Sequence, residues 1–167
     1  CRQPGSTYKP IYYALALDRD FHFHTMLNDV AKKEAEIDPV TGKVWTPKNY
    51  EGKIETETSL ESALVWSKNV PSVALFRKLG GPSVEKWARR LGFTSPIIAD
   101  KALALGASCT FPWQMGRAFA VFARNGKASD VRWVRRITDS SGEIIEDNTV
   151  VSDPALHPAS RFDRIFA

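Results

Sequence analysis

A serine and a lysine lie three residues apart near the start of the sequence, where residues 5–10 read GSTYKP. Residues spaced in this way share one face of a helix, so the hydroxyl of Ser6 and the amine of Lys9 can touch. A serine attacks a substrate once a base has removed its proton, and a lysine becomes such a base when burial or a neighbouring cation lowers its pKa. The pair predicts nucleophilic catalysis at Ser6, and the alternative is that Ser6 only caps a helix.

The same spacing occurs a second time, in Ser83 and Lys86. A four-residue pattern of this kind also arises by chance. Ser83 is predicted to cap a helix that ends at Gly92, which would leave Lys86 on a solvated helix face. We therefore expect a structural role for the second pair.

A Ser-x-Asn sequence at residues 67–69 strengthens the case for the first pair. Thr58 and Glu61 fit a capping box, which predicts a short helix leading into this sequence. Pro71 suits the first turn of the helix that follows. A corner between two helices can present the side chains of Ser67 and Asn69 to a cleft.

The elements that would position these residues are mainly helical. An apolar run predicts a helix over residues 6–18, and two glycines at 80 and 81 end a helix predicted over residues 70–79. A further helix is predicted from residue 110. We expect its apolar stripe to face the core, and the stripe consists of Phe111, Met115, Phe119 and Phe122.

Two short hairpins are predicted beside these helices. One turn at residues 38–42 lies between short apolar segments, and another at 139–142 lies within the β-rich residues 131–147. Residues 20–30 read as a connection, and residues 148–167 read as loop. After the first hairpin, Asn49 and Tyr50 are candidates to line a substrate groove.

The composition is that of an ordinary globular chain. One domain is expected for 167 residues, and no apolar run is long enough to cross a membrane. The net charge of +4 is scattered, and no basic and aromatic motif indicates nucleic-acid binding. Cys1, Cys109 and the three histidines lack the spacing of a metal site, and the sequence leaves open whether the two cysteines pair.

The residues around these motifs resemble one family closely. The matching blocks follow one another in the order 2–10, 25–29, 45–52, 67–71, 88–92, 103–106 and 118–126. They are similar to the transpeptidase domain of bifunctional class A penicillin-binding proteins. Ser-x-x-Lys followed by a Ser-x-Asn motif is typical of this family and of class A β-lactamases. The resemblance extends from residue 2 to about residue 147.

One motif of that family is missing, because no lysine in the sequence is followed by Thr-Gly or Ser-Gly. In the family this third motif lies on a strand beside the nucleophile. The resemblance implies an α+β, mainly helical fold that lacks most of its sheet, with residues 1–167 forming a partial transpeptidase domain. The family's glycosyltransferase domain and membrane anchor are also outside these residues. We expect the uncovered helical face to favour self-association.

The resemblance implies a serine-type D-Ala-D-Ala transpeptidase that cross-links peptidoglycan stem peptides. Ser6 would be the nucleophile and Lys9 its base. Ser67 would pass a proton to the leaving amine. Asn69 would bind substrate and orient Lys9.

Further expectations follow from the same resemblance. Lys68, Asn49 and Tyr50 would contact substrate, and no metal or organic cofactor would be needed. Stem peptides and β-lactams would be the partners, whereas nucleic acid would not. The parent protein would work at the extracytoplasmic face of the bacterial inner membrane, in the periplasm, and would reach the membrane only through segments outside this chain.

Two other kinds of function stay open. A D,D-carboxypeptidase or a β-lactamase would pass the acyl group to water, and turnover of a β-lactam distinguishes these enzymes from a transpeptidase. A catalytically silent fold would only bind a ligand or a partner. The missing third motif keeps this last alternative open, and acylation by labelled penicillin tests it.

Overall fold

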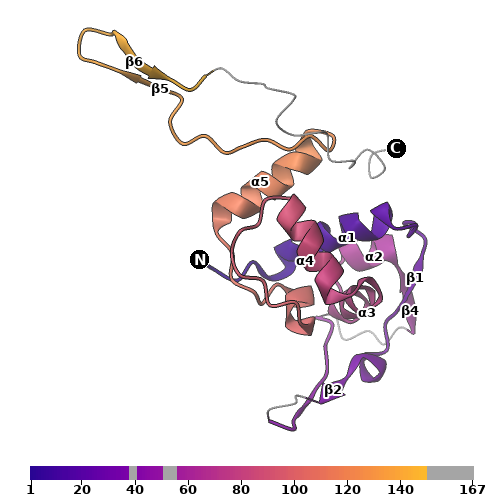
Figure 1. The fold of residues 1–167 in the computed structure, drawn as a ribbon. Helices are drawn as coiled ribbons and strands as arrows, with labels where there is room; N and C mark the ends of the chain where they lie inside the picture. Colours follow the sequence, from indigo (N-terminus) through magenta and orange to yellow (C-terminus); the bar gives the residue numbers. More distant parts are fainter. Residues whose placement is uncertain (38–40, 51–55, 150–167) are drawn as a thin grey trace.

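The computed structural model describes residues 1–37, 41–50 and 56–149, and it places a helical body next to a protruding hairpin (Figure 1). The α-helices are α1 Lys9–Asp18, α2 Leu60–Val65, α3 Asn69–Leu79, α4 Gly81–Arg90 and α5 Pro112–Ala123. The 3-10 helices are η1 Gly5–Tyr8, η2 Ala31–Glu34 and η3 Lys101–Leu105. The strands are β1 Met26–Asn28, β2 Glu36–Ile37, β3 Val44–Trp45, β4 Glu57–Ser59, β5 Arg136–Thr138 and β6 Ile144–Asp147.

Helix α1 forms the centre of the body and packs against α2, α3 and α4. Residues 11–16 of this helix are buried without a break. Such a helix is apolar on every face, which explains why its sequence reads as a continuous apolar run rather than a stripe. Lys9, at the first position of this helix, is buried as well.

Three polar atoms on or against α1 have hydrogen-bond partners despite their burial. The Tyr12 hydroxyl donates to the carbonyl of Ala104 at 2.9 Å. The Tyr13 hydroxyl lies 2.8 Å from the Ser72 hydroxyl. The indole N–H of Trp87 in α4 donates to the carbonyl of Ile11 at 2.8 Å. These bonds fix η3, α3 and α4 to the central helix.

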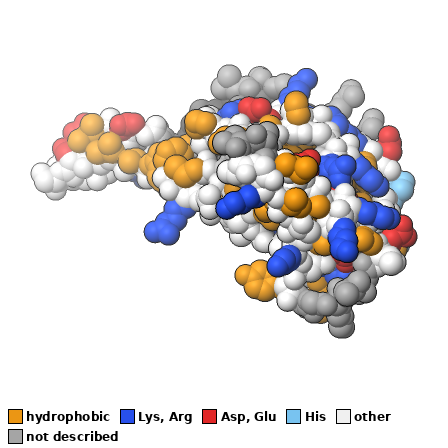
Figure 2. Space-filling model, turned by 90° about the horizontal axis from the view of Figure 1, so that it is seen from below, with side chains coloured by type: hydrophobic (Ala, Val, Ile, Leu, Met, Phe, Trp, Pro, Cys, Tyr) orange, Lys and Arg blue, Asp and Glu red, His pale blue; other side chains and the backbone are white. Residues whose placement is uncertain are grey.

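The strands of the described residues form three two-stranded antiparallel sheets. The β1–β4 pair joins the body, with Leu27 opposite Thr58. The β2–β3 pair places Ile37 opposite Val44, which confirms the first predicted hairpin, although residues 38–40 lie outside the described residues. The β5–β6 pair confirms the second hairpin. It extends away from the body and carries exposed hydrophobic side chains (Figures 1 and 2).

Helix boundaries agree with the sequence predictions at several positions. The helix predicted over residues 6–18 is observed as η1 followed by α1, and the helix predicted over residues 70–79 is observed as α3, with Gly80 as its C-cap. The connection predicted at residues 20–30 contains β1, which was missed. Residues 150–167, most of the predicted terminal loop, lie outside the described part of the chain.

Both predicted helix caps were wrong. Helix α2 is capped by Ser59, whose hydroxyl accepts a bond from the N–H of Ser62 at 3.1 Å, and Thr58 belongs to β4 instead. Helix α4 begins at Gly81, so Ser83 lies in its first turn rather than at its cap. Lys86 is exposed on α4, as predicted.

The apolar stripe predicted for α5 faces the core only in part, since Met115 and Phe122 are partly buried against the core. Phe111 and Phe119 are exposed, whereas Gln114, Ala118 and Val121 are buried. These three residues follow a spacing of four and three, so they form one face of the helix. The face of α5 toward the core therefore includes these three residues, whereas the rings of Phe111 and Phe119 are exposed to solvent.

Helix α4 offers a test of how the body is held together. Trp87→Phe removes the buried indole donor to Ile11 and should lower the free energy of unfolding by about 1–3 kcal/mol. The neighbouring Lys86→Ala removes only an exposed side chain and should change it by less than about 0.5 kcal/mol. Urea denaturation of this chain measures both. Equal effects would contradict the role assigned to the Trp87 contact.

Candidate active site

Lys9 is the chemically unusual residue of the body. It is the first residue of α1, it follows the 3-10 turn η1, and it is 1% exposed. Lysine is almost never fully buried unless its amine has partners. The position of the helix therefore requires a set of acceptors around the Lys9 amine.

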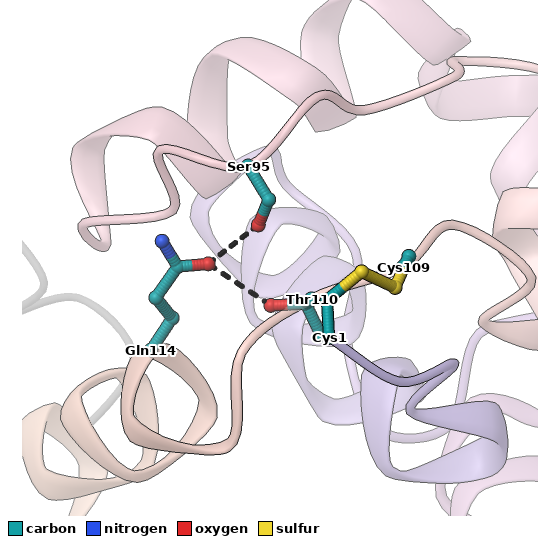
Figure 3. Close-up of a disulfide and its surroundings, with 5 residues drawn as sticks. All are labelled: Cys1, Ser95, Cys109, Thr110 and Gln114. Atoms are coloured by element: carbon teal, nitrogen blue, oxygen red, sulfur yellow. Dashed lines mark hydrogen bonds between the residues drawn. A yellow bond between two sulfur atoms is a disulfide. The ribbon is translucent and has the colours of Figure 1, made fainter.

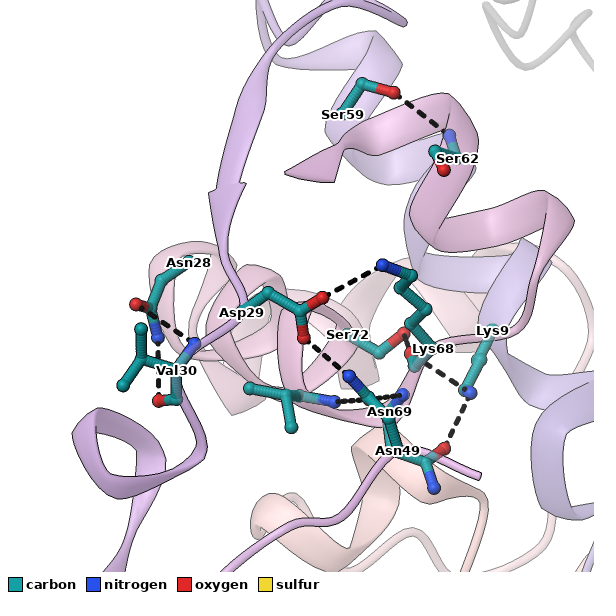
Figure 4. Close-up of polar contacts among 11 residues, drawn as sticks. Lys9, Asn28, Asp29, Val30, Asn49, Ser59, Ser62, Lys68, Asn69 and Ser72 are labelled. Carbon is teal, nitrogen blue, oxygen red and sulfur yellow. Dashed lines mark hydrogen bonds and ion pairs between the residues drawn. The ribbon is translucent and has the colours of Figure 1, made fainter. Parts of the chain in front are cut away.

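The corner between α2 and α3 supplies those acceptors. Lys9 Nζ donates to the carbonyl and the hydroxyl of Ser67, at 2.6 and 3.1 Å. It also donates to Asn69 Oδ1 at 2.8 Å and lies 3.3 Å from the carbonyl of Lys68. Figure 4 shows Lys9 facing Lys68 and Asn69 at this corner. The structure thus brings together three of the four predicted catalytic residues.

Ser67 owes its position to the way in which α2 ends. Its N–H bonds to the carbonyl of Leu64 at 3.0 Å, and the N–H of Lys68 bonds to the carbonyl of Ala63 at 2.9 Å. This pair of bonds is a Schellman motif, whose left-handed position is usually taken by glycine. Ser67 occupies it with φ +50°. A non-glycine residue is strained there by about 1 kcal/mol, so the turn keeps a hydroxyl at the expense of stability.

Asn49 holds the beginning of α3 from a distant part of the chain. Its Oδ1 accepts bonds from the N–H groups of Asn69 and Val70, both at 2.9 Å. The Asn69 amide in turn donates to the carbonyl of Lys48 at 2.9 Å. The first N–H groups of a helix have no partner within it, so Asn49 acts as a cap. Asn69 is thereby oriented with its Oδ1 toward Lys9.

Asp29 links Asn49 to Lys68 at this corner. Its side chain is fully buried and accepts a bond from Asn49 Nδ2 at 2.6 Å. Its second oxygen pairs with Lys68 Nζ at 3.0 Å. Figure 4 shows both contacts converging on the carboxylate. Asp29 was given no role from the sequence, although it ends the matching block at residues 25–29, which was the signal available.

The residues predicted to bind substrate have different surroundings. Asn49 and Lys68 make the internal contacts just described, and the Lys68 side chain is 12% exposed. Tyr50 is fully exposed. Substrate contact by these three residues stays a prediction, and for Asn49 and Lys68 the structure adds a role in holding the corner.

Burial lowers the pKa of Lys9 from its ordinary value to about 8. Burial disfavours the charged form of an amine because the protein interior solvates it less well than water. From the sequence, burial or a neighbouring cation was expected to lower this pKa. In the structure, burial is the cause of the lowered Lys9 pKa. The neighbouring cation, the Lys68 ammonium, is paired with Asp29. A sizeable fraction of Lys9 is thus neutral near pH 8 and able to accept a proton.

Ser6 lies in η1, and its side chain is exposed. The N-cap of η1 is Pro4, so the capping role considered for Ser6 is wrong. Within the described residues the Ser6 hydroxyl makes no hydrogen bond, and the expected contact with Lys9 is not formed. The arrangement is an exposed hydroxyl three residues before a buried amine. A ligand at Ser6 would therefore meet a free hydroxyl.

Two kinds of feature are absent from the part of the chain that the structure describes. It contains no cluster of three or more His, Cys, Asp or Glu side chains that could hold a metal ion. None of its helices is both long and apolar enough to cross a membrane.

The sequence of this chain matches a known protein family over most of its length. The model of the penicillin binding protein transpeptidase domain matches residues 2–159. The chain belongs to this transpeptidase family. Penicillin-binding protein 1A of Neisseria lactamica is 35% identical over 144 residues, and that of Vibrio cholerae is 33% identical over 144 residues. The two alignments cover 86% of this chain but only 18% and 17% of the relatives.

Solved structures confirm the predicted fold. The crystal structure of penicillin-binding protein 1A from Haemophilus influenzae matches with a TM-score of 0.76 at 30% identity, over 86% of this chain and 21% of that one. Penicillin-binding protein A from Mycobacterium tuberculosis, solved as a penicillin G acyl-enzyme complex, matches with a TM-score of 0.71 at 23% identity, over 87% of this chain and 38% of that one. The chain thus has part of the α+β transpeptidase fold.

The strained turn at Ser67 can be tested by paired substitutions. Ser67→Ala and Ser67→Gly both remove the hydroxyl that contacts Lys9, but only glycine relaxes the left-handed backbone. We expect the glycine variant of this chain to be more stable than the alanine variant by about 0.5–1 kcal/mol. Chemical denaturation of the two variants measures this difference. An alanine variant at least as stable as the glycine variant would refute strain at this turn.

Proposed function

We propose that this chain forms the nucleophile-bearing part of a serine D,D-transpeptidase that cross-links peptidoglycan stem peptides. The observation that carries the proposal is the buried Lys9 amine, held by Ser67 and Asn69 and three residues from the exposed Ser6. Membership of the transpeptidase family supports it. Because the chain spans less than a fifth of the curated relatives it matches, the activity of the whole protein is part of the proposal.

In the proposed first step, Ser6 Oγ attacks the carbonyl between the two terminal D-alanines of a stem peptide. Lys9 in its neutral form takes the hydroxyl proton, directly or through the Ser67 hydroxyl, which lies 3.1 Å from Lys9 Nζ. The peptide bond breaks, the leaving amine receives a proton through Ser67, and D-alanine departs. Ser6 is left as an ester of the shortened stem peptide.

In the second step, an amine of a neighbouring stem peptide attacks this ester. A new amide forms, the bond to Ser6 Oγ breaks, and the serine regains its proton. The backbone N–H of Ser6 would supply one donor to the oxyanion of each tetrahedral intermediate, and the family's third motif would supply the other. A β-lactam would acylate Ser6 by the first step, with its ring amide in place of the peptide bond.

The proposed location is the extracytoplasmic face of a bacterial inner membrane. The disulfide between Cys1 and Cys109 supports this location, because such bonds persist in oxidising compartments such as the periplasm. Segments outside this chain would provide attachment to the membrane.

The nucleophile is tested by comparing the two Ser-x-x-Lys sequences. In the complete transpeptidase domain, Ser6→Ala should abolish covalent labelling by fluorescent penicillin, because Ser6 carries the exposed hydroxyl three residues before the buried Lys9 amine. Ser83→Ala serves as the matched control and should leave labelling unchanged, since Lys86 is exposed. Gel fluorescence and mass spectrometry of the labelled peptide provide the measurement. Label on the Ser83 peptide would overturn the assignment.

A second prediction concerns the 167-residue chain by itself. It should not react measurably with labelled penicillin, although Ser6, Lys9, Ser67 and Asn69 are all present. Loss of one oxyanion donor alone slows acyl transfer by about 10²–10³.

Co-folding the same chain with the segment that carries the third motif should restore labelling. Fast and stoichiometric labelling of the chain alone would show that the third motif contributes less than proposed. No labelling of the co-folded protein would instead favour a catalytically silent fold.

A further inference from the structure

The segment that leads into Ser6 is joined to residues 106–110 through three pairs of residues. The Cys1–Cys109 disulfide joins them covalently, with the two Cα atoms 5.6 Å apart (Figure 3). Next to it, Arg2 and Thr110 exchange two backbone hydrogen bonds of 2.9 and 2.8 Å. Gly5, the residue before Ser6, donates its N–H to the carbonyl of Gly106 at 3.2 Å. We call this set of contacts the clasp.

The closest approach in the clasp lies directly before the nucleophile. Gly106 has φ +71°, and a Cβ atom there would lie 2.1 Å from the carbonyl oxygen of Gly5. Atoms at that distance overlap, so any side chain at position 106 would push the backbone of Gly5 away. The backbone just before Ser6 therefore packs against residue 106 with no room for a side chain.

The partner segment is itself anchored to the body. The Thr110 hydroxyl donates to Gln114 Oε1 at 3.1 Å, and the Ser95 hydroxyl donates to the same oxygen at 2.5 Å (Figure 3). Gln114 is fully buried, and its amide donates to the Thr94 hydroxyl at 2.6 Å. At the other end, η3 is joined to α1 through Ala104. The clasp therefore connects the turn that carries Ser6 to residues that are hydrogen-bonded to the body at both ends.

Lys9 and Ser6, the base and the nucleophile of the proposed reaction, are positioned by different parts of the structure. Lys9 is held by residues 67–69, none of which belongs to the clasp. The Ser6 side chain is exposed and makes no hydrogen bond within the described residues. The backbone alone locates the Ser6 hydroxyl, through Lys9 on one side and the clasp on the other.

We propose that the Cys1–Cys109 disulfide is a positioning element for acylation at Ser6, so that its reduction slows the reaction without altering the base. The inference rests on the proposed function, in which Ser6 is the nucleophile. Without the covalent bond, the hydrogen bonds that the structure describes between residues 1–5 and residues 106–110 are the backbone bonds of Arg2 and Gly5, and the turn gains freedom to shift. A displacement of about 1 Å at a reacting atom lowers rates by up to about 10²-fold. We expect the acylation rate constant to fall about tenfold or more.

The experiment uses the complete transpeptidase domain that contains this segment. Fluorescent penicillin is mixed with the oxidised protein, the reduced protein and the variant Cys1→Ser/Cys109→Ser at a temperature where all three are folded. The rate constant, the fraction of protein labelled and the pH midpoint of the rate are recorded separately. Reductant added to the double variant is the control and should have no effect.

A second variant perturbs the same turn with the disulfide intact. Gly106→Ala should lower the rate constant because the added methyl group displaces Gly5. In every slowed form the pH midpoint should remain where it is in the oxidised protein, since Lys9 keeps its partners. Reoxidation of the wild-type protein should restore the rate.

An unchanged rate constant after reduction overturns the inference. So does a loss confined to the labelled fraction, which indicates that the bond only keeps the protein folded, or a shift of the pH midpoint, which indicates that the base has moved. In each of these cases label is still found at Ser6, and the proposed function stands. An oxidised protein that carries no label at Ser6 instead overturns the proposed function and the inference together.

Discussion

The burial of one lysine amine determines much of this structure. Residues 11–16 of α1 are buried at the centre of the body, and Lys9, the first residue of the helix, is buried with them. The amine cannot stay there without acceptors. Ser67 and Asn69 supply them from the corner between α2 and α3. The same burial that requires these partners also lowers the pKa of Lys9, which makes an ordinary cation into a candidate base.

The α2–α3 corner contains two features that lower the stability of the fold. Ser67 occupies a left-handed position suited to glycine. The carboxylate of Asp29 is buried, and it is stabilised there by Lys68 and Asn49. A buried ion pair contributes little net stability, but removing one partner strongly destabilises the protein. Such a pair therefore fixes geometry more than it stabilises the fold. The strained turn and the buried ion pair therefore orient the partners of Lys9 while lowering the stability of the fold. This is common where function requires a strained or polar interior.

The sequence predicted what local patterns can specify. The apolar run of α1, the glycine stop of α3 and both hairpins follow from residues close together in the chain. The catalytic grouping of Lys9, Ser67 and Asn69 came from motif resemblance. Asp29, the capping role of Asn49 and the disulfide were not predicted, because their partners lie 20 to 108 residues away. Phe111 and Phe119 of the predicted α5 stripe are exposed, whereas Met115 and Phe122 pack against the core, since hydrophobicity alone does not decide which residues meet the core.

The most direct test of this account is the titration of Lys9 itself. Carbon-13 at the lysine Cε position, followed by NMR from pH 6 to 11, reports the protonation of each amine, and the variant Lys9→Met identifies the signal that belongs to Lys9. The structure predicts a midpoint near 8, because the amine is buried among the residues of the α2–α3 corner. A midpoint at the ordinary lysine value, above about 10, would contradict the claim that the fold prepares Lys9 as a base.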